Sequence, residues 1–434
     1  MESLEEIKSL ANYCLNCKNK PCLKACPLNN DIPTFIKFIK DQHFRKAYDV
    51  LIKTSVMPSI CGRICPHSKQ CEGSCIRGIK GSPVQIGKLE AFIGDIAINR
   101  KYHLNNPNKK YKQKVAIIGS GPSGITCAAY LASKGFNVTV FEKQKKLGGL
   151  LQYGIPKFRL KQSIVNQTIK NILDLGIKVN TNSCLGKNLS FNRLKKDYDA
   201  IYLSIGSNIP CSLNIEGKNL KGVFGANSLL EYNLHPSYIN KKVAIIGGGN
   251  VAIDCARTIN RLGAKNTYIV YRRNEKQMPA ENKEIQSAKS EGIIFLYQTN
   301  IIRILGDNNN CVSKIECIKT KLVSSLNQDR EIPINIKDTN YLMDIDCVVM
   351  AIGSRSDICL LNKLGLNTDS KGYIDVDNNY MTCCDKVFAG GDLIGTKSTV
   401  AWASRSGVDA AKKIETYLIK NKHTKSVFKS IKQI

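Results

Sequence analysis

The pattern of apolar and polar positions separates the 434-residue chain into a helical first part and a longer α/β part. In segments 32–39 and 44–52, apolar residues recur at the spacing of a helix face. The runs Val115–Ile118 and Val243–Ile246 are instead short and continuously apolar, as buried strands are. Each run is followed by a glycine-rich loop and a helical pattern. The chain therefore contains the same strand–turn–helix unit twice, 128 residues apart.

The first glycine-rich loop has the spacing that binds a dinucleotide pyrophosphate. It consists of Gly119, Ser120, Gly121, Pro122, Ser123 and Gly124. In such a loop the first glycine allows a tight turn, the second lets backbone N–H groups approach the phosphates, and the third lets the helix pack closely on the strand. Glu142 follows the next predicted strand, where a carboxylate accepts hydrogen bonds from a ribose diol. We expect FAD or NAD here, without a 2′-phosphate.

The second loop fits the same pattern, with alanine at the last small position. It consists of Gly247, Gly248, Gly249, Asn250, Val251 and Ala252. The strand after it ends in Tyr271, Arg272 and Arg273, so Arg272 takes the place of Glu142. A guanidinium cannot accept from a ribose hydroxyl, but it matches the geometry of a phosphate. The second loop therefore predicts NADPH rather than NADH; the alternative is that both arginines are ordinary surface charges.

Cysteines crowd the first part of the chain. Of 18 cysteines, eight lie in two groups: Cys14, Cys17, Cys22 and Cys26, and then Cys61, Cys65, Cys71 and Cys75. Thiolates at this spacing suit iron–sulfur clusters, with structural zinc as the main rival. Pro27 directly after the first group, and a flavin that needs an electron outlet, favour clusters. The other cysteines are expected to be buried or incidental thiols. Since no close cysteine pair follows the first loop, disulfide reduction is disfavoured.

Composition narrows the remaining possibilities. The formal net charge of +29 could indicate an acidic partner. However, the lysines are spread along the whole chain without a nucleic-acid motif, so we expect no nucleic-acid partner. There is no long apolar run and no basic leader before an apolar stretch, so we expect no membrane span and a cytoplasmic protein.

These patterns predict an α/β fold with two Rossmann-like dinucleotide-binding domains, preceded by a small α-helical iron–sulfur domain. Apolar strands return at 347–352 and 386–393, after the second unit, which indicates that the NADPH-binding domain is inserted into the FAD-binding domain. The expected domains are residues 1–108 for the clusters, 109–238 with 346–420 for FAD, and 239–345 for NADPH, followed by a basic tail at 421–434.

Together these motifs resemble the small (beta) subunit family of glutamate synthase. The wider group includes the large subunit of NADH-dependent ferredoxin–NADP reductases, sulfide dehydrogenase and the reductase part of dihydropyrimidine dehydrogenase. The resemblance covers nearly the whole chain. It also rests on the segments Ile60–Pro66, Cys71–Cys75, Gly148–Pro156, Met278–Ala280 and Ala389–Asp392. Gly149, in the third of these segments, is a candidate cofactor-binding residue.

The resemblance implies a ligand set for two [4Fe–4S] clusters. One would be held by Cys14, Cys17, Cys22 and Cys75. The other would be held by Cys26, Cys65 and Cys71, with Glu90 as the candidate fourth ligand and Cys61 as a spare thiol. A carboxylate ligand would shift the potential of the second cluster relative to an all-cysteine one.

The resemblance also implies how the late part of the chain meets FAD. Gly391 and Asp392 would bind the ribityl or pyrophosphate region. Ser398, Thr399 and Val400 would begin a helix whose positive end faces the flavin pyrimidine. Lys397 and Trp402 depart from the smaller or more acidic residues expected in this stretch.

By this resemblance, the protein is an NADPH-dependent FAD and iron–sulfur oxidoreductase, with no residue assigned as a catalytic acid or base. It would work with a large amidotransferase subunit, as the small subunit of glutamate synthase, or with another redox subunit. The alternatives are a subunit of an NADH-dependent ferredoxin–NADP transhydrogenase, the reductase part of a dihydropyrimidine dehydrogenase, and a non-enzymatic redox-sensing scaffold.

Overall fold

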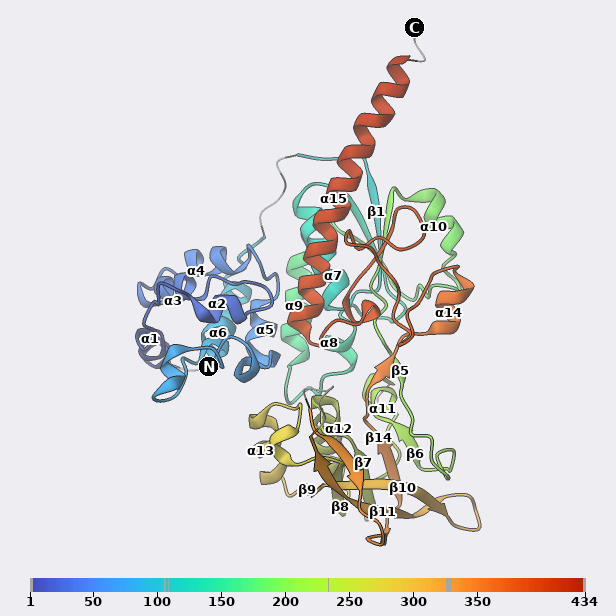
Figure 1. Ribbon diagram of the computed structural model, residues 1–434. Coiled ribbons are helices and arrows are strands. Elements are labelled where there is room, and N and C mark those ends of the chain that lie inside the picture. Colours follow the sequence, from blue (N-terminus) through green and yellow to red (C-terminus); the bar gives the residue numbers. More distant parts are fainter. Residues whose placement is uncertain (1–2, 105–106, 108, 233, 325–329, 432–434) are drawn as a thin grey trace. The chain divides into compact units, whose positions relative to one another are not determined.

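The computed structural model describes residues 3–104, 107, 109–232, 234–324 and 330–431, and side chains except those of 232 and 421–431. The chain divides into two compact units. The first comprises residues 1–152, 157–207 and 356–434, and the second comprises 153–156 and 208–355. Figure 1 colours both units along the sequence.

The N-terminal part of the first unit is helical, as its apolar spacing predicts (Figure 1). Its α-helices are α1 (Leu4–Asn12), α2 (Pro21–Ala25), α3 (Ile32–Lys40), α4 (Phe44–Leu51), α5 (Pro58–Ile64) and α6 (Ile86–Asn99), with 3₁₀ turns η1 (His67–Lys69) and η2 (Ile76–Ile79). Helices α5 and α6 cross closely through glycines. A Cβ on Gly62 would lie 2.4 Å from the amide nitrogen of Ala91, and one on Gly94 would lie 2.2 Å from that of Ser59. This crossing brings the cysteines around α5 beside Glu90.

The rest of the first unit is built on a parallel sheet. Its strand order is β16 (Val387–Ala389), β4 (Ala200–Leu203), β1 (Lys114–Ile118), β2 (Asn137–Phe141) and β3 (Lys178–Asn180). Its helices are α7 (Pro122–Ser133), α8 (Leu150–Tyr153), α9 (Gln162–Leu173), α10 (Phe191–Asp197), α14 (Ile358–Lys363) and α15 (Val400–Ile431). Helices α7 and α15 lie side by side (Figure 1), linked by a 2.9 Å hydrogen bond from the Tyr130 hydroxyl to Glu415. The first part of the predicted tail, residues 421–431, therefore belongs to helix α15, which ends at Ile431.

The second unit repeats this architecture. Its parallel sheet has the order β6 (Val223–Gly225), β14 (Cys347–Met350), β7 (Lys242–Ile246), β8 (Asn266–Tyr271) and β9 (Ile294–Tyr297). Its helices are α11 (Ala226–Tyr232), α12 (Asn250–Arg261) and α13 (Asn282–Ser290), with the 3₁₀ turn η3 (Glu275–Gln277). The short strands β5 (Ile209–Pro210) and β15 (Ser354–Arg355) pair where the chain enters and leaves the unit.

Two strands lie elsewhere than the sequence predicts. We expected residues 347–352 in the FAD-binding domain, but β14 pairs with β7 from Cys347–Val243 to Met350–Ile246. Similarly β6, within the expected segment 109–238, pairs with β14. A short apolar strand pairs equally well with either sheet, so its sequence carries no sign of which sheet it joins.

An antiparallel layer completes the second unit. It contains β10 (Thr299–Gly306), β11 (Val312–Val323), β12 (Ile332–Asn335) and β13 (Tyr341–Asp344), in which β11 pairs with the other three. Its apolar side joins buried residues of β7, β8 and β14 in one core, including Ile304, Ile315 and Cys317. The layer therefore packs on one face of the parallel sheet and reaches the loops at its edge.

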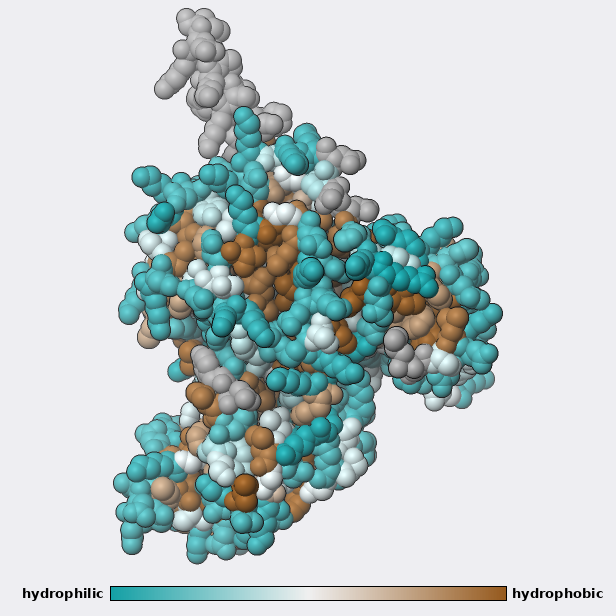
Figure 2. Space-filling view, turned by 180° about the vertical axis from the view of Figure 1, so that it is seen from behind, coloured by the Kyte–Doolittle hydropathy of each residue, from teal (hydrophilic) through white to brown (hydrophobic). Residues whose placement is uncertain are grey.

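Many hydrophilic side chains lie on the surface of the protein (Figure 2), as expected from its content of lysine and arginine. Hydrophilic side chains cover much of the face seen in Figure 2, with apolar areas between them. Within the described part of the chain, none of the helices combines the length and apolar composition that a membrane crossing needs.

Candidate functional site

The first glycine loop joins β1 to α7, with its three glycines in different surroundings. Gly119 has φ of +98°, and a Cβ there would lie 2.5 Å from the carbonyl oxygen of Ser204. A Cβ on Gly124 would lie 2.0 Å from the carbonyl oxygen of Gly119. At Gly121, by contrast, no heavy atom of the described residues lies within 4 Å of that position. The first and third glycines are needed for packing, whereas the second leaves open space at the helix N-terminus, where a pyrophosphate fits.

Glu142 lies directly after β2 and is buried. Its Oε2 accepts hydrogen bonds from the Ser120 amide at 3.0 Å and the Ser120 hydroxyl at 2.5 Å, and its Oε1 accepts from the Gln144 amide at 2.9 Å. The Ser120 hydroxyl also accepts from the Gly148 amide at 3.0 Å. Each carboxylate oxygen can accept more than one hydrogen bond, so Glu142 can still accept hydrogen bonds from a ribose diol. Ser120 lies between the first two glycines, where the G-x-G-x-x-G pattern specifies no residue type, so this role could not be predicted from the sequence.

The Gly148–Gly149 turn closes against the same loop. Gly149 has φ of +53°, and a Cβ there would lie 2.9 Å from the Cα of Gly121. The structure therefore brings Gly149 beside the open position of the first loop. No larger residue fits between the two backbones at this point.

Gly391 and Asp392 begin the 3₁₀ turn η4 (Gly391–Ile394) and also lie beside this loop. A Cβ on Gly391 would lie 2.8 Å from the Cβ of Ser123. The Gly391 amide donates to the Ser406 hydroxyl at 2.9 Å, and the hydroxyls of Ser123 and Tyr202 lie 2.7 Å apart. Burial raises the pKa of Asp392, although a hydrogen bond from Thr396 opposes this shift. Segments far apart in sequence thus meet beside the first glycine loop.

Helix α15 begins where the resemblance places it. The Thr399 hydroxyl accepts from the Trp402 amide at 3.3 Å and so caps the first turn. This leaves the positive end of the helix beside η4. The ammonium of Lys397 lies 4.8 Å from the centroid of the Trp402 ring, so the two residues that depart from the expected pattern contact each other.

The second glycine loop joins β7 to α12 in the same way. A Cβ on Gly247 would lie 2.3 Å from the carbonyl oxygen of Ala351, whereas the nearest atom to a Cβ on Gly249 is 4.0 Å away on Pro279. Asn250 fastens the loop to the Met278–Glu281 segment, because its Oδ1 accepts from the Glu281 amide at 3.0 Å. Val251 follows in the first turn of α12 and is 40% exposed. Like the first loop, this one leaves open space at the second glycine of its pattern, Gly249.

Arg272 and Arg273 follow β8, on the same edge of the sheet as the second loop. Arg272 is exposed and Arg273 is half-buried. The Arg273 Nε donates to the carbonyl oxygen of Glu331 at 3.1 Å, and the Thr320 hydroxyl donates to the carbonyl oxygen of Arg272 at 2.9 Å. The antiparallel layer thus holds the backbone of the pair in place.

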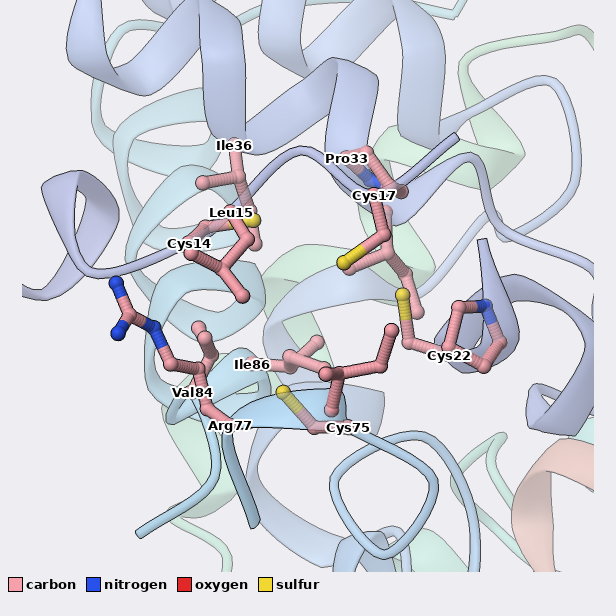
Figure 3. A pocket seen from close by; sticks show the side chains of 13 residues that line it. Cys14, Leu15, Cys17, Cys22, Pro33, Ile36, Cys75, Arg77, Val84 and Ile86 are labelled. Carbon is pink, nitrogen blue, oxygen red and sulfur yellow. The ribbon is translucent and has the colours of Figure 1, made fainter. Parts of the chain in front are cut away.

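Four cysteines from distant segments line one pocket in the N-terminal part. They are Cys14, Cys17, Cys22 and Cys75, the set that the resemblance assigns to one cluster. In Figure 3 their sulfur atoms face a common space bordered by apolar side chains such as Ile36 and Ile86. Within the described residues, no three His, Cys, Asp or Glu side chains are placed to hold a single metal ion. In a [4Fe–4S] cluster the cysteines bind different irons, so a shared pocket is the arrangement it needs.

The second predicted set also comes together. Glu90 is buried, accepts a 3.2 Å hydrogen bond from Asn30, and lies within electrostatic range of Cys26, Cys65 and Cys71. Cys61, the expected spare thiol, lies in the same group. It shares a hydrogen bond with Cys65 that lowers the pKa of Cys61 and raises that of Cys65.

Burial controls the chemistry of these side chains. It raises the pKa of Cys22 and of Cys26 to about 11, that of Cys71 well above its ordinary value, and that of the Glu90 carboxyl likewise. Metal ligation requires thiolates, so these groups would release protons when they bind a cation. Sulfur ligands in apolar surroundings are typical of a site for a soft metal cluster.

Comparison with known proteins identifies the family. Residues 113–407 match the family described as pyridine nucleotide-disulphide oxidoreductase, and residues 2–102 match that described as dihydropyrimidine dehydrogenase domain II, 4Fe-4S cluster. The chain is 31% identical to the glutamate synthase [NADPH] small chain of Escherichia coli, over 95% of this chain and 92% of that one. It is 33% identical to the NADP(+)-dependent formate dehydrogenase subunit beta of Moorella thermoacetica, over 92% of this chain but 60% of that one.

A solved structure supports the fold. FprA from Mycobacterium tuberculosis in complex with NADPH has a TM-score of 0.63 and 20% identity, over 73% of this chain and 86% of that one. With the sequence matches and the two glycine loops, this establishes the predicted fold class and cofactor types. The chain belongs to the pyridine nucleotide-disulphide oxidoreductase family, among the NADPH-dependent FAD enzymes with an N-terminal 4Fe-4S domain that include the glutamate synthase small chains.

Proposed function

We propose that this protein is the small subunit of a cytoplasmic glutamate synthase, in which it takes electrons from NADPH and delivers them to a large amidotransferase subunit. The observation that supports the redox activity is the pair of similar glycine loops. The strand after the first loop leads to the hydrogen-bonded carboxylate of Glu142, and the strand after the second leads to Arg272 and Arg273. The similarity to the E. coli glutamate synthase small chain, which spans 92% of that relative, favours this partner.

In this proposal each site residue has a binding or orienting role. The first loop, Glu142, Gly149 and the Gly391–Asp392 turn hold FAD, while Thr399 caps the helix that faces it. The second loop with Arg272 and Arg273 holds NADPH. Bound flavin supplies the conversion between a two-electron hydride and the single electrons that iron–sulfur clusters accept. The two cysteine sets, with Glu90, hold the clusters. Apolar neighbours of these side chains exclude water.

Anaerobic affinity purification from native cells tests the partner. A large amidotransferase-type subunit in the purified complex would support glutamate synthase. A small ferredoxin-reductase-like flavoprotein would instead indicate transhydrogenation, which requires the same residues in this chain. The Moorella relative, a formate dehydrogenase subunit by name, makes another redox partner a further alternative.

Rapid anaerobic mixing tests the redox chemistry itself. NADPH should bleach the oxidised flavin absorbance, and an unchanged spectrum would refute the proposal. Turnover of NADPH with an artificial electron acceptor separates an enzyme from a redox-sensing scaffold. Arg272→Gln should raise the KM for NADPH about tenfold or more, because a charge-assisted hydrogen bond contributes about 1.5–3 kcal/mol, while NADH kinetics should change little.

A further inference from the structure

The second predicted cluster site gathers one side chain more than the four ligands that a [4Fe–4S] cluster needs. Cys26, Cys65, Cys71 and Glu90 are the set that the resemblance implies, and Cys61 lies among them. Cys61 is 1% exposed and lies within electrostatic range of both Cys26 and Glu90. Its thiol therefore belongs to the immediate surroundings of the cluster without being one of the expected ligands.

Helix α5 holds Cys61 directly beside Cys65. The Cys65 amide donates to the Cys61 carbonyl oxygen at 3.1 Å, so the two residues are one helical turn apart, where side chains are neighbours. The two side chains share a hydrogen bond between their sulfur atoms. One sulfur of this pair therefore donates and the other accepts.

Ligation fixes the direction of this hydrogen bond. Cysteine binds a metal as the thiolate, so a ligated Cys65 has no hydrogen to donate and can only accept. The hydrogen of the shared bond then comes from the Cys61 thiol. Cys61 thus contacts the cluster through the sulfur of one of its ligands.

Ser55 supports Cys61 from the preceding turn of the chain. Its hydroxyl donates to the Cys61 sulfur at 3.8 Å, and Ser55 is 2% exposed, so solvent does not compete for this bond. The result is a buried chain of donors that runs from Ser55 to Cys61 and on to Cys65. Hydrogen bonds in such a chain polarise one another, so the Ser55 hydroxyl strengthens the donation from Cys61.

We propose that Cys61 tunes the second cluster, because its thiol donates a hydrogen bond to the Cys65 sulfur and so raises the reduction potential of the cluster. The inference rests on the proposed function, since it assumes the second ligand set. Reduction adds negative charge to the cluster and its sulfur ligands. A donor at the Cys65 sulfur therefore stabilises the reduced form more than the oxidised form. Cys61 acts through Cys65, so it is a positioning residue and not a ligand.

Redox titration monitored by EPR, on the full-length protein purified anaerobically, measures the midpoint potentials of both clusters. Cys61→Ala removes the donor and should lower one potential by a three- to tenfold change in the reduction equilibrium, which is about 30–60 mV for one electron. Cys61→Ser keeps a donor and should stay closer to the wild-type potential. Ser55→Ala should lower the same potential by less. Cys317→Ala removes another buried thiol, in β11 of the second unit, and is the matched control that should change neither potential.

Iron content and potential together separate the outcomes. If Cys61→Ala loses about half of the iron and acid-labile sulfide, Cys61 is a ligand and the inference is overturned. Full iron content with unchanged potentials also overturns it. If Cys61→Ala does not fold, Ser55→Ala decides, because it leaves the thiol in place and should still lower one potential. A wild-type protein without iron–sulfur clusters would overturn the proposed function itself, and the inference with it.

Discussion

The first glycine loop permits a sharp prediction, because its second and third glycines both belong to the G-x-G-x-x-G pattern but have different surroundings. At Gly121, an N-cap with φ −64° and ψ −179°, an added methyl meets no described atom within 4 Å. Alanine is allowed there and should cost the apoprotein about 1 kcal/mol or less, the usual price of a poorer N-cap residue. At Gly124 the same methyl would lie 2.0 Å from the Gly119 carbonyl oxygen and 2.4 Å from the Ser204 hydroxyl oxygen.

The two variants should therefore fail in opposite ways. Gly121→Ala should lower the apoprotein's stability by about 1 kcal/mol or less but weaken FAD binding at least about tenfold, since the methyl fills the space where backbone meets pyrophosphate. Gly124→Ala should destabilise the apoprotein by about 3 kcal/mol, because the overpacking of backbone outweighs the gain of about 1 kcal/mol from replacing glycine in a helix.

Urea unfolding of both apoproteins and fluorescence titration with FAD measure these effects. The reasoning would be refuted by a Gly121→Ala protein that binds FAD with the wild-type Kd. It would equally be refuted by a Gly124→Ala apoprotein as stable as the wild type.

Three further results are expected. Cys75→Ser should remove about half of the iron and acid-labile sulfide, whereas Cys61→Ser should leave both contents unchanged if Cys61 is not a ligand; chemical analysis of anaerobically purified protein decides. In the second unit, burial would raise the pKa of Glu291, but hydrogen bonds from Arg257 and Arg261 outweigh it and lower the pKa. The resulting stability is present above the unfolded pKa of about 4.3 and is lost as pH falls through the lower folded value. Glu291→Gln should therefore cost about 1–3 kcal/mol at pH 7 and progressively less toward pH 3 in urea unfolding series.

Local motifs made much of this site predictable. The helices over 32–40 and 44–51 and both strand–turn–helix units follow from periodicity and glycine spacing, which act within a dozen residues. The four-cysteine pocket came from resemblance rather than spacing, because Cys75 lies far from the first three along the chain. Nothing local in the sequence marks it as their neighbour.

Long-range pairing was not predictable in the same way. The strand Cys347–Met350 joins the sheet of the second unit, although its apolar residues would suit either sheet. Arg330 reaches Tyr271 only because β11 and β12 form a hairpin that returns to β8. In a basic protein a single arginine in a loop is no signal, so such a contact is found only once the fold is known.

The two loops also show why the residue between their first two glycines matters. Ser120 occupies that position in the first loop, where its amide and hydroxyl both hold Glu142. Gly248 occupies it in the second loop, and the Tyr271 ring fills the space that a side chain would need. Ser120 thus gives Glu142 a hydroxyl donor besides an amide donor, whereas glycine at 248 leaves room for the Tyr271 ring, whose hydroxyl contacts Arg330. Placing an acid after the second strand alone would therefore leave it without the hydroxyl donor that Ser120 gives Glu142, and the loop could offer it only backbone amides.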